Sequence, residues 1–303
     1  TIMFEANAKP PIFFHLAGIV PIAGQSLDFN FPWHDCLQPI AQNYLAVERA
    51  VVECAYAGCE TIWVVCHDDM QPLIRYRLGE YIQDPVYLYR SLGKIPYAEK
   101  RKPIPIHYVP IHPKDREKRD CLSWSILYGA MASYWTSKQV SKWVTPSRYY
   151  VAFPYGVYDP KILREHRKDI SSDLGFFLSH SGQTVKDGEY LGFTFNENEF
   201  IKYRKYFRKE ATGLFTSKLS DDGYPREKLP IEKRYSARHF SLDTVFKSAI
   251  INSAKVIELP WYKKIDSWQG LKEYLSSDEQ LERPSKELLS YHEFNRIGEI
   301  IDD

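Results

Sequence analysis

Apolar and polar positions alternate along the first part of the chain in a way that predicts strands and helices in turn. The apolar runs 12–17 and 62–66 are short and bounded by glycine or polar residues, which is typical of buried strands. Between them, apolar residues recur at helical spacing from Tyr44 to Ala55, and Gly58 is placed to end that helix. A strand, a helix and a second strand in this order predict parallel strands joined by a right-handed crossover.

The same alternation continues to about residue 160. Strands are predicted at 104–109 and 149–153, and helices begin near Pro72 and near Asp120, which we expect to cap its helix. Four apolar strands that alternate with helices predict an α/β fold, in which a mostly parallel sheet is flanked by helices on both faces.

Beyond Asp173 the pattern changes to predicted strands at 174–178 and 190–195 and a basic helix at 196–208. The last residues are polar and charged. From these changes we expect an α/β domain at 12–170, a smaller mixed α+β part at 171–275 that completes the domain, and a peripheral polar tail at 276–303.

Composition excludes some classes of function. The 303 residues carry a formal net charge of only +1, so a general attraction to nucleic acid is not expected. No apolar run approaches the roughly 20 residues that a membrane span needs, and no secretory signal is visible, so we expect no membrane partner. The five cysteines are odd in number and form no Cys-x-x-Cys pair, which favours free thiols in a cytoplasmic setting.

A sheet of this kind binds ligands at the carboxyl ends of its strands. Four segments follow or face those ends in the predicted order. They are Gly18 to Gln25, His67 to Asp69, Ser123 to Ser125 and Tyr155 to Asp159. We therefore expect these four segments to converge on one crevice.

Several short motifs occur in an order that resembles a known family. Leu16-Ala17-Gly18 ends the first strand, Leu37-Gln38-Pro39-Ile40 follows the long loop, and Ala57-Gly58 ends the first helix. Leu122 to Ala130 and Trp261 to Leu275 continue the order. The chain is similar in these motifs to the sugar-nucleotide nucleotidyltransferases, the pyrophosphorylases that make NDP-sugars.

Three positions depart from the pattern of that family. Ile19-Val20-Pro21 replaces much of the glycine-rich loop, and Trp33-His34-Asp35 stands where the catalytic lysine of the family lies. The magnesium-binding Asp of the family corresponds most nearly to Tyr155, with Asp159 next along the chain. The catalytic residues are therefore unassigned.

The resemblance implies the nucleotide-diphospho-sugar transferase type of fold. It also implies an enzyme that joins a nucleoside triphosphate to a sugar phosphate or similar small acceptor with Mg²⁺, so that its partner is a nucleotide or nucleotide sugar. By motif position, it implies ligand-binding roles for Gly18, Gly24, Gln25, Ser123 and Ser125, and metal-binding roles for Asp159 and Asp68.

Each of these motifs also has a purely structural interpretation. Gly18 to Gln25 can be an ordinary connection, His67 to Asp69 can cap the helix begun at Pro72, and Asp159 can cap a helix at Pro160. The basic helix interleaves Tyr and Phe with Lys and Arg, which suits a phosphate backbone or a solvated face. The alternative function is a non-catalytic protein of the same fold that serves binding or assembly with a protein partner in a larger particle.

Overall fold

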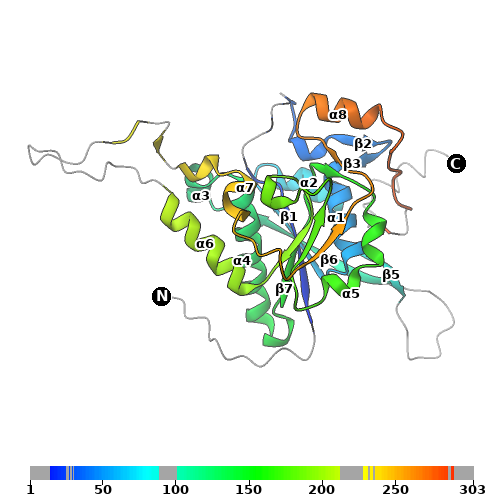
Figure 1. Cartoon of the computed structure of the whole chain (residues 1–303), viewed down its shortest axis with the longest axis horizontal. Coiled ribbons are helices and arrows are strands. Elements are labelled where there is room, and N and C mark those ends of the chain that lie inside the picture. Colours follow the sequence, from blue (N-terminus) through cyan, green and yellow to red (C-terminus); the bar gives the residue numbers. More distant parts are fainter. Residues whose placement is uncertain are drawn as a thin grey trace, which may run out of the picture.

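The computed structural model describes residues 14–24, 27, 29, 31–88, 101–211, 228–230, 233–234, 236–285 and 288–289. They fold around one eight-stranded sheet (Figure 1). In order across the sheet, the strands are β11 (Lys255–Glu258), β9 (Phe176–Ser179), β10 (Phe193–Phe195), β7 (Arg148–Val151), β1 (Leu16–Pro21), β4 (Thr61–Cys66), β6 (Arg101–Pro110) and β5 (Tyr81–Leu88).

The sheet is mostly parallel. β1 lies between β4 and β7 and runs parallel to both, and β6 continues in parallel beyond β4. β9 and β11 also pair in parallel, whereas β10 and β5 run antiparallel to their neighbours. The predicted α/β fold is confirmed, and the first two predicted strands are direct neighbours, with Ala17 opposite Thr61.

Helices cover both faces of the sheet (Figure 1). The first face packs against α1 (Ala46–Ala57), α2 (Gln71–Leu78), η3 (Pro160–Arg164) and α5 (Arg167–Ile170). The opposite face packs against α4 (Leu122–Val140), α6 (Glu197–Glu210) and α7 (Leu242–Phe246). The other helices are α3 (Pro113–Lys118), α8 (Trp268–Leu275) and the short turns η1 (Asp35–Leu37), η2 (Lys142–Val144), η4 (Val185–Asp187) and η6 (Ser236–His239).

Successive side chains of strand β1 point alternately to the two faces of the sheet. Leu16 and Val20 join the apolar cluster under α1, whereas Ala17 and Ile19 join the cluster under α4. Gly18 faces α1, and a Cβ there would lie 2.8 Å from Cys54 Sγ, so glycine lets the helix lie close to the strand. The strand continues to Pro21, so Gly18 lies inside a strand and not in the loop that the sequence predicted.

A third apolar cluster closes the end of the sheet where β1 and β7 finish. It joins α8 to two ribbons, β2 (Pro39–Ala41) with β3 (Tyr44–Leu45), and β8 (Gly156–Val157) with β12 (Lys263–Lys264). Phe29 and Tyr274 are buried at its centre. The cluster therefore ties the loop after β1 to the closing segment of the chain.

Two opposite charges are buried beneath α1. Arg49 and Glu53 are fully enclosed, one helical turn apart, and their side chains pair at 2.8 Å. Tyr150 Oη of β7 donates to Glu53 Oε1 at 2.7 Å, and Arg49 Nη2 donates to the Phe153 carbonyl at 2.5 Å. Arg49 and Glu53 have the i, i+4 spacing of a solvated surface pair, but here the pair is fully buried. Burial raises the pKa of Glu53, while the charge of Arg49 opposes that rise.

The structure also tests the predicted helix ends and strands. Gly58 ends α1 with a left-handed φ of 90°, as predicted, and Asn196, where the basic helix was predicted to start, caps α6. Strand β5 was missed, because its Pro85 argues against a strand. Strands β9, β10 and β11 extend the sheet of β1, and the predicted boundary at residue 170 stays a prediction. In the described part of the chain, none of the helices combines the length and apolarity needed to traverse a bilayer.

We expect Gly192→Ala to destabilise the fold by about 1–3 kcal/mol, because a Cβ there would lie 2.3 Å from Tyr150 Oη and 2.8 Å from Glu53 Oε1. The cost should shrink in a Tyr150→Phe background, where the closest atom is absent. Urea unfolding of the wild type, both single variants and the double variant measures the difference. Strictly additive costs would contradict the proposed steric cause.

Candidate functional site

The carboxyl ends of β1 and β4 begin the candidate site. After β1, the backbone N–H groups of Ile22 and Ala23 both donate to the Val65 carbonyl at 2.9 Å. The next residue, Gly24, lies against the start of α4, where a Cβ would stand 3.2 Å from the Leu122 nitrogen. Ser125 Oγ of α4 donates to the Ala23 carbonyl. Residues 22–24, which we call the β1 loop, are therefore joined both to β4 and to the first turn of α4.

A histidine and a carboxylate meet beside this loop. His67, directly after β4, lies with Nε2 2.9 Å from Asp120 Oδ1, and both side chains are largely shielded from water. The prediction that Asp120 caps α4 is wrong, because the cap position is Cys121 and Asp120 binds His67 instead. The pair links the end of β4 to the approach to α4.

His34 completes this cluster from the long loop after β1. Burial lowers its pKa to about 4, and the nearby charge of His67 adds to the shift, while Asp69 and Asp120 oppose it. Its Nδ1 accepts a hydrogen bond from the Cys36 N–H at 3.2 Å. The neutral ring therefore carries its proton on Nε2, which makes His34 an uncharged donor at neutral pH. Burial also raises the pKa of the Cys36 thiol, so Cys36 is not placed as a nucleophile.

Arg116 of α3 brings positive charge to the same edge. It pairs with Asp68 at 2.9 Å and with Asp69 at 3.2 Å. Burial alone would raise the pKa of Asp69, but the hydrogen bond and charge of Arg116 lower it. Neither carboxylate caps α2, whose cap position is Met70 without a side-chain hydrogen bond, so the structural interpretation from the sequence is wrong. Both acids are partnered by Arg116 instead.

The four segments expected to converge do so only in part. Gly24, His67 to Asp69 and Ser125 lie together at this edge. Gly18 is inside β1, and Ser123 turns toward α7, where its hydroxyl lies 3.4 Å from the Ser241 carbonyl. Gln25 lies outside the described residues. Contacts of these residues with a ligand stay predictions.

Asp159 occupies a different place. Its Oδ1 accepts from the Lys161 N–H at 3.0 Å and so caps η3, as the structural interpretation predicted. It lines a cavity of about 330 Å³ together with Tyr158 of the same segment and Trp261. His34, His67 and Asp120 do not line that cavity.

Tyr155, at the position of the metal-binding Asp of the resembling family, is almost fully buried. Its ring packs edge-on against Tyr190 at 5.6 Å, and burial raises the pKa of its hydroxyl. Lys264 reaches the same neighbourhood, with Nζ 5.1 Å from the centre of the Tyr190 ring. The ammonium pairs loosely with Glu189 at 3.9 Å and Asp266 at 3.5 Å. A cation of the chain itself therefore lies near Tyr155, the position that corresponds most nearly to the metal-binding Asp of the resembling family.

The donor set does not form a metal centre made by the protein alone. Within the described ranges, no three His, Cys, Asp or Glu side chains are grouped so as to hold a metal ion. Asp68 is paired with Arg116, and Asp159 serves as a cap. Any metal at the carboxyl edge would therefore need ligands from a substrate.

From the sequence, His34 was named only at the place of the family's lysine, and Asp120, Arg116 and Lys264 were not among the candidate site residues. His67 and Asp120 are 53 residues apart, and no motif joins them. A signal was nevertheless present, since polar residues directly after predicted parallel strands gather at one edge of the sheet.

Comparison with known proteins supports the fold. No protein-family model matches the sequence, and the curated proteins contain no match. A structure provisionally assigned as a glucose-1-phosphate thymidylyltransferase from Bacillus anthracis, in complex with sucrose, matches with a TM-score of 0.52 and 11% identity, covering 88% of this chain and 98% of that one. A nucleoside-diphosphate-sugar pyrophosphorylase from Vibrio cholerae matches with a TM-score of 0.45 and 12% identity over 86% and 100% of the two chains. From the first match, the fold is of the nucleotide-diphospho-sugar transferase type.

The partial burial of His34, beside His67, predicts a pH dependence of stability. An unfolded chain binds a proton at this residue near pH 6.5, whereas the folded chain binds it only near pH 4. This contribution to stability should be complete above pH 6.5 and be lost as the pH falls toward 4.

His34→Asn keeps an acceptor for the Cys36 N–H but does not titrate, so it should lose that pH dependence, on the order of 1–3 kcal/mol. Urea unfolding of both proteins between pH 7.5 and 4.5 measures the effect. Parallel stability curves would show that His34 is not the titrating group.

Proposed function

We propose that the chain binds a nucleoside triphosphate at the carboxyl edge of β1 and β4 and transfers its nucleotidyl group to a sugar phosphate or a similar small acceptor. The observation that carries this proposal is the joining of the β1 loop to the first turn of α4, with Arg116 alongside. The N–H groups of Ile22 and Ala23 are already bonded to the Val65 carbonyl, so Gly24 is the residue of this loop whose backbone can approach a phosphate. A glycine beside a helix start and a guanidinium is an environment that favours phosphate.

The transfer requires an oxygen of the acceptor phosphate to attack the α-phosphorus. A new P–O bond forms there, the bond to the oxygen that bridges to the β-phosphorus breaks, and pyrophosphate leaves with that electron pair. Negative charge spreads over the transferring phosphoryl oxygens, so positioned donors and cations lower the barrier. We assign the neutral Nε2–H of His34 and the guanidinium of Arg116 to this role, because His34 stands where the resembling family has a lysine and Arg116 pairs with the two acids that follow β4.

Mg²⁺ enters the proposal as an ion carried by the triphosphate. Phosphate oxygens and waters can supply most of its ligands, with one or two carboxylates from the protein. Asp68 and Asp69 can each exchange Arg116 for a metal, because both side chains are 61% exposed, and we assign the role to Asp68. The ion would neutralise charge on the phosphates. The five free, buried thiols support a reducing compartment such as the cytoplasm.

A specific observation favours the alternative, a non-catalytic protein that retains ligand binding. The acids that could bind metal are already engaged, Asp68 and Asp69 by Arg116 and Asp159 by the start of η3. Lys264 lies near Tyr155, where the family has its acid. Such a protein would bind a nucleotide or nucleotide sugar without turnover and would act through a protein partner.

A thermal-shift screen of nucleoside triphosphates and NDP-sugars, with and without Mg²⁺, tests binding, because a ligand specific to the native state raises the melting temperature. Pyrophosphate release with sugar 1-phosphates tests turnover. Gly24→Val should abolish the nucleotide-dependent shift, since a side chain there presses on the Leu122 backbone and displaces the β1 loop.

Gly175→Val is the matched control for Gly24→Val. Its Cβ would also lie 3.2 Å from its nearest neighbour, here Ala254 Cβ, at the start of β9 and away from the β1 loop, so it should lower the melting temperature while the nucleotide-dependent shift remains. Binding without pyrophosphate release would select the non-catalytic alternative. The absence of both in the wild type would refute the site.

Asp159 offers a separate test of metal binding. Asp159→Ala should cost about 1 kcal/mol of stability through loss of the cap, whereas Asp159→Asn should leave stability nearly unchanged. If Asp159 binds Mg²⁺, Asp159→Asn should still remove most metal-dependent turnover, because an amide is a poorer ligand for a hard cation. Pyrophosphate release by the two variants decides this, and full turnover by Asp159→Asn excludes Asp159 as an essential ligand.

A further inference from the structure

The positive charge of the chain is not evenly spread. In α6, the segment 202–209 contains five Lys or Arg residues and no acid, although the whole chain has a net charge of only +1. Of these five, only Lys209 has an ion-pair partner within the described part of the chain. The net charge of the whole chain led us to expect no general attraction to nucleic acid, but that sum hides the local excess of positive charge on α6. Unpartnered cations concentrated on one helix favour a polyanionic partner.

Tyr203 and Phe207 of this helix are turned into the core, which agrees with the structural interpretation of its aromatic residues. The cations are not all turned to solvent, however. Arg204 lies over the junction with α4, and its pKa is lowered by burial and by the charges of Arg208 and Arg119. Arg208 of the same helix and Arg119 from the approach to α4 are therefore each close enough to Arg204 for their charges to act on it. Such crowding is relieved when an anion binds between them.

The ring contacts beneath these groups fix their arrangement. The Arg119 guanidinium lies 4.5 Å above the Trp124 ring, and Trp124 packs edge-on against Phe207 of α6 at 5.3 Å. Arg119 also pairs with Asp115, at 3.3 Å. Arg119, Arg204 and Arg208 form what we call the arginine cluster. The adjoining α3 and η6 add Lys114 and Arg238, since α3 packs against η6 and η6 packs against α6.

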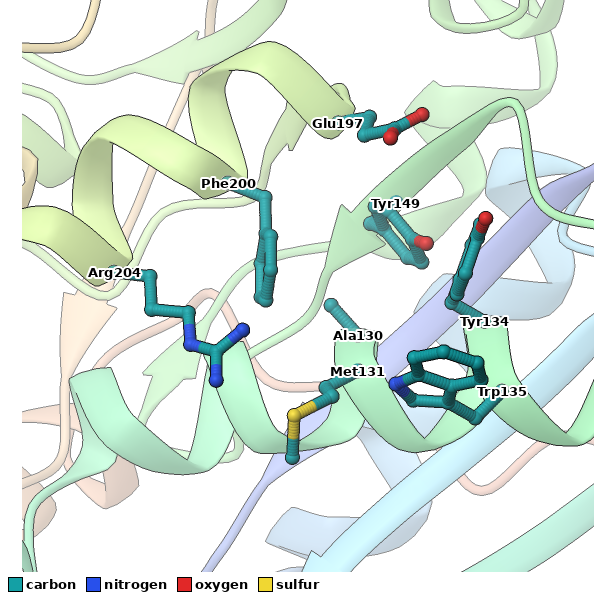
Figure 2. Close-up of a pocket in the computed structure, with 8 residues that line it drawn as sticks. All are labelled: Ala130, Met131, Tyr134, Trp135, Tyr149, Glu197, Phe200 and Arg204. Atoms are coloured by element: carbon teal, nitrogen blue, oxygen red, sulfur yellow. The ribbon is translucent and has the colours of Figure 1, made fainter. Parts of the chain in front are cut away.

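A hollow lined with aromatic residues continues from the arginine cluster along the junction of α4 and α6. Figure 2 shows Arg204 and Phe200 on α6 above Met131 and Trp135 on α4, with Tyr134 beside them. Trp135 is 38% exposed, so an aromatic surface is open to solvent here. The far end carries Glu197, whose pKa is raised by burial and lowered by Lys138. Lys138 lies at the same end, with Nζ 5.5 Å from the centres of the Tyr134 and Trp135 rings, and its charge offsets the repulsion between Glu197 and a phosphate there.

We propose that the aromatic hollow and the arginine cluster together bind a single-stranded nucleic acid. Bases would stack on Trp135 and Tyr134, and phosphates would lie against Arg204 and Arg208. These two arginines are four residues apart on one helix face, about 6 Å along the axis, which suits successive phosphates of an extended strand. Stacking surfaces beside a positively charged groove are the usual means of binding single strands without sequence preference. This binding does not depend on the proposed nucleotidyl transfer.

The test is fluorescence anisotropy with labelled oligothymidine and oligouridine of about 12 nucleotides at about 50 mM salt, where phosphate contacts are strong. The wild type should bind, and the logarithm of its affinity should fall linearly with the logarithm of salt concentration. Arg204→Glu with Arg208→Glu should weaken binding at least about tenfold and reduce that slope by about 1 to 2. Trp135→Ala should weaken binding about fivefold or more.

Matched controls lie on the other side of the molecule. Lys168→Glu with Lys272→Glu makes the same change of charge on α5 and α8, which Figure 1 shows far from α6, and Tyr81→Ala removes an exposed ring on β5. Both controls should bind within about twofold of the wild type. Urea unfolding verifies that every variant is folded.

The absence of binding at about 50 mM salt would overturn the proposal. Equal weakening by the arginine and lysine double variants would do the same, because it would mean a diffuse electrostatic effect. Displacement of the oligonucleotide by polyglutamate at equal charge would identify an acidic protein surface as the partner instead. If the wild type binds the oligonucleotide but shows no nucleoside triphosphate binding in the thermal-shift screen, only the proposed function is refuted.

Discussion

The burial of Arg49 and Glu53 is the constraint on which much of the molecule depends. Two charges without access to water are tolerated only if they pair and if their remaining atoms find partners. β7 and the segment after it supply two such partners, the Tyr150 hydroxyl and the Phe153 carbonyl. The centre of the Tyr158 ring lies 4.9 Å from the guanidinium, whose Nε and Nη1 make no hydrogen bond with the described residues. Helix α1 is thereby held against the carboxyl end of β7.

A series of backbone and side-chain contacts links this buried pair to the edge of the sheet. The segment after Phe153 forms β8, which pairs with β12, and the Ile265 N–H next to β12 donates to the Tyr155 carbonyl at 2.8 Å. Gln38 of the long loop in turn donates to the Ile265 carbonyl at 3.1 Å. The closing segment, the long loop that carries His34 and the end of β7 are therefore positioned as a unit. The candidate site depends on a charge pair that it does not contact.

Local signals made much of the fold predictable. The apolar runs of β1 and β4, the glycine that ends α1 and the caps Asn196 and Asp159 are all readable from neighbouring residues. Burial of an i, i+4 ion pair is not, because Arg49 and Glu53 have the same spacing as a solvated pair. Strand β5 was missed since Pro85 is tolerated only at a sheet edge, and position in the sheet is a tertiary property. The predicted parallel sheet placed His67 at its carboxyl edge, but the partner Asp120 is far away in sequence.

All five cysteines of the chain are free and at most 6% exposed. For Cys36, Cys54, Cys66 and Cys121, burial also raises the thiol pKa, so little of the reactive thiolate forms at neutral pH. We therefore expect the natural thiols to react slowly with alkylating reagents while the protein is folded. A single cysteine introduced on the surface would carry a dye or spin label without removal of any native thiol, which makes the native sequence itself a suitable background for site-specific labelling.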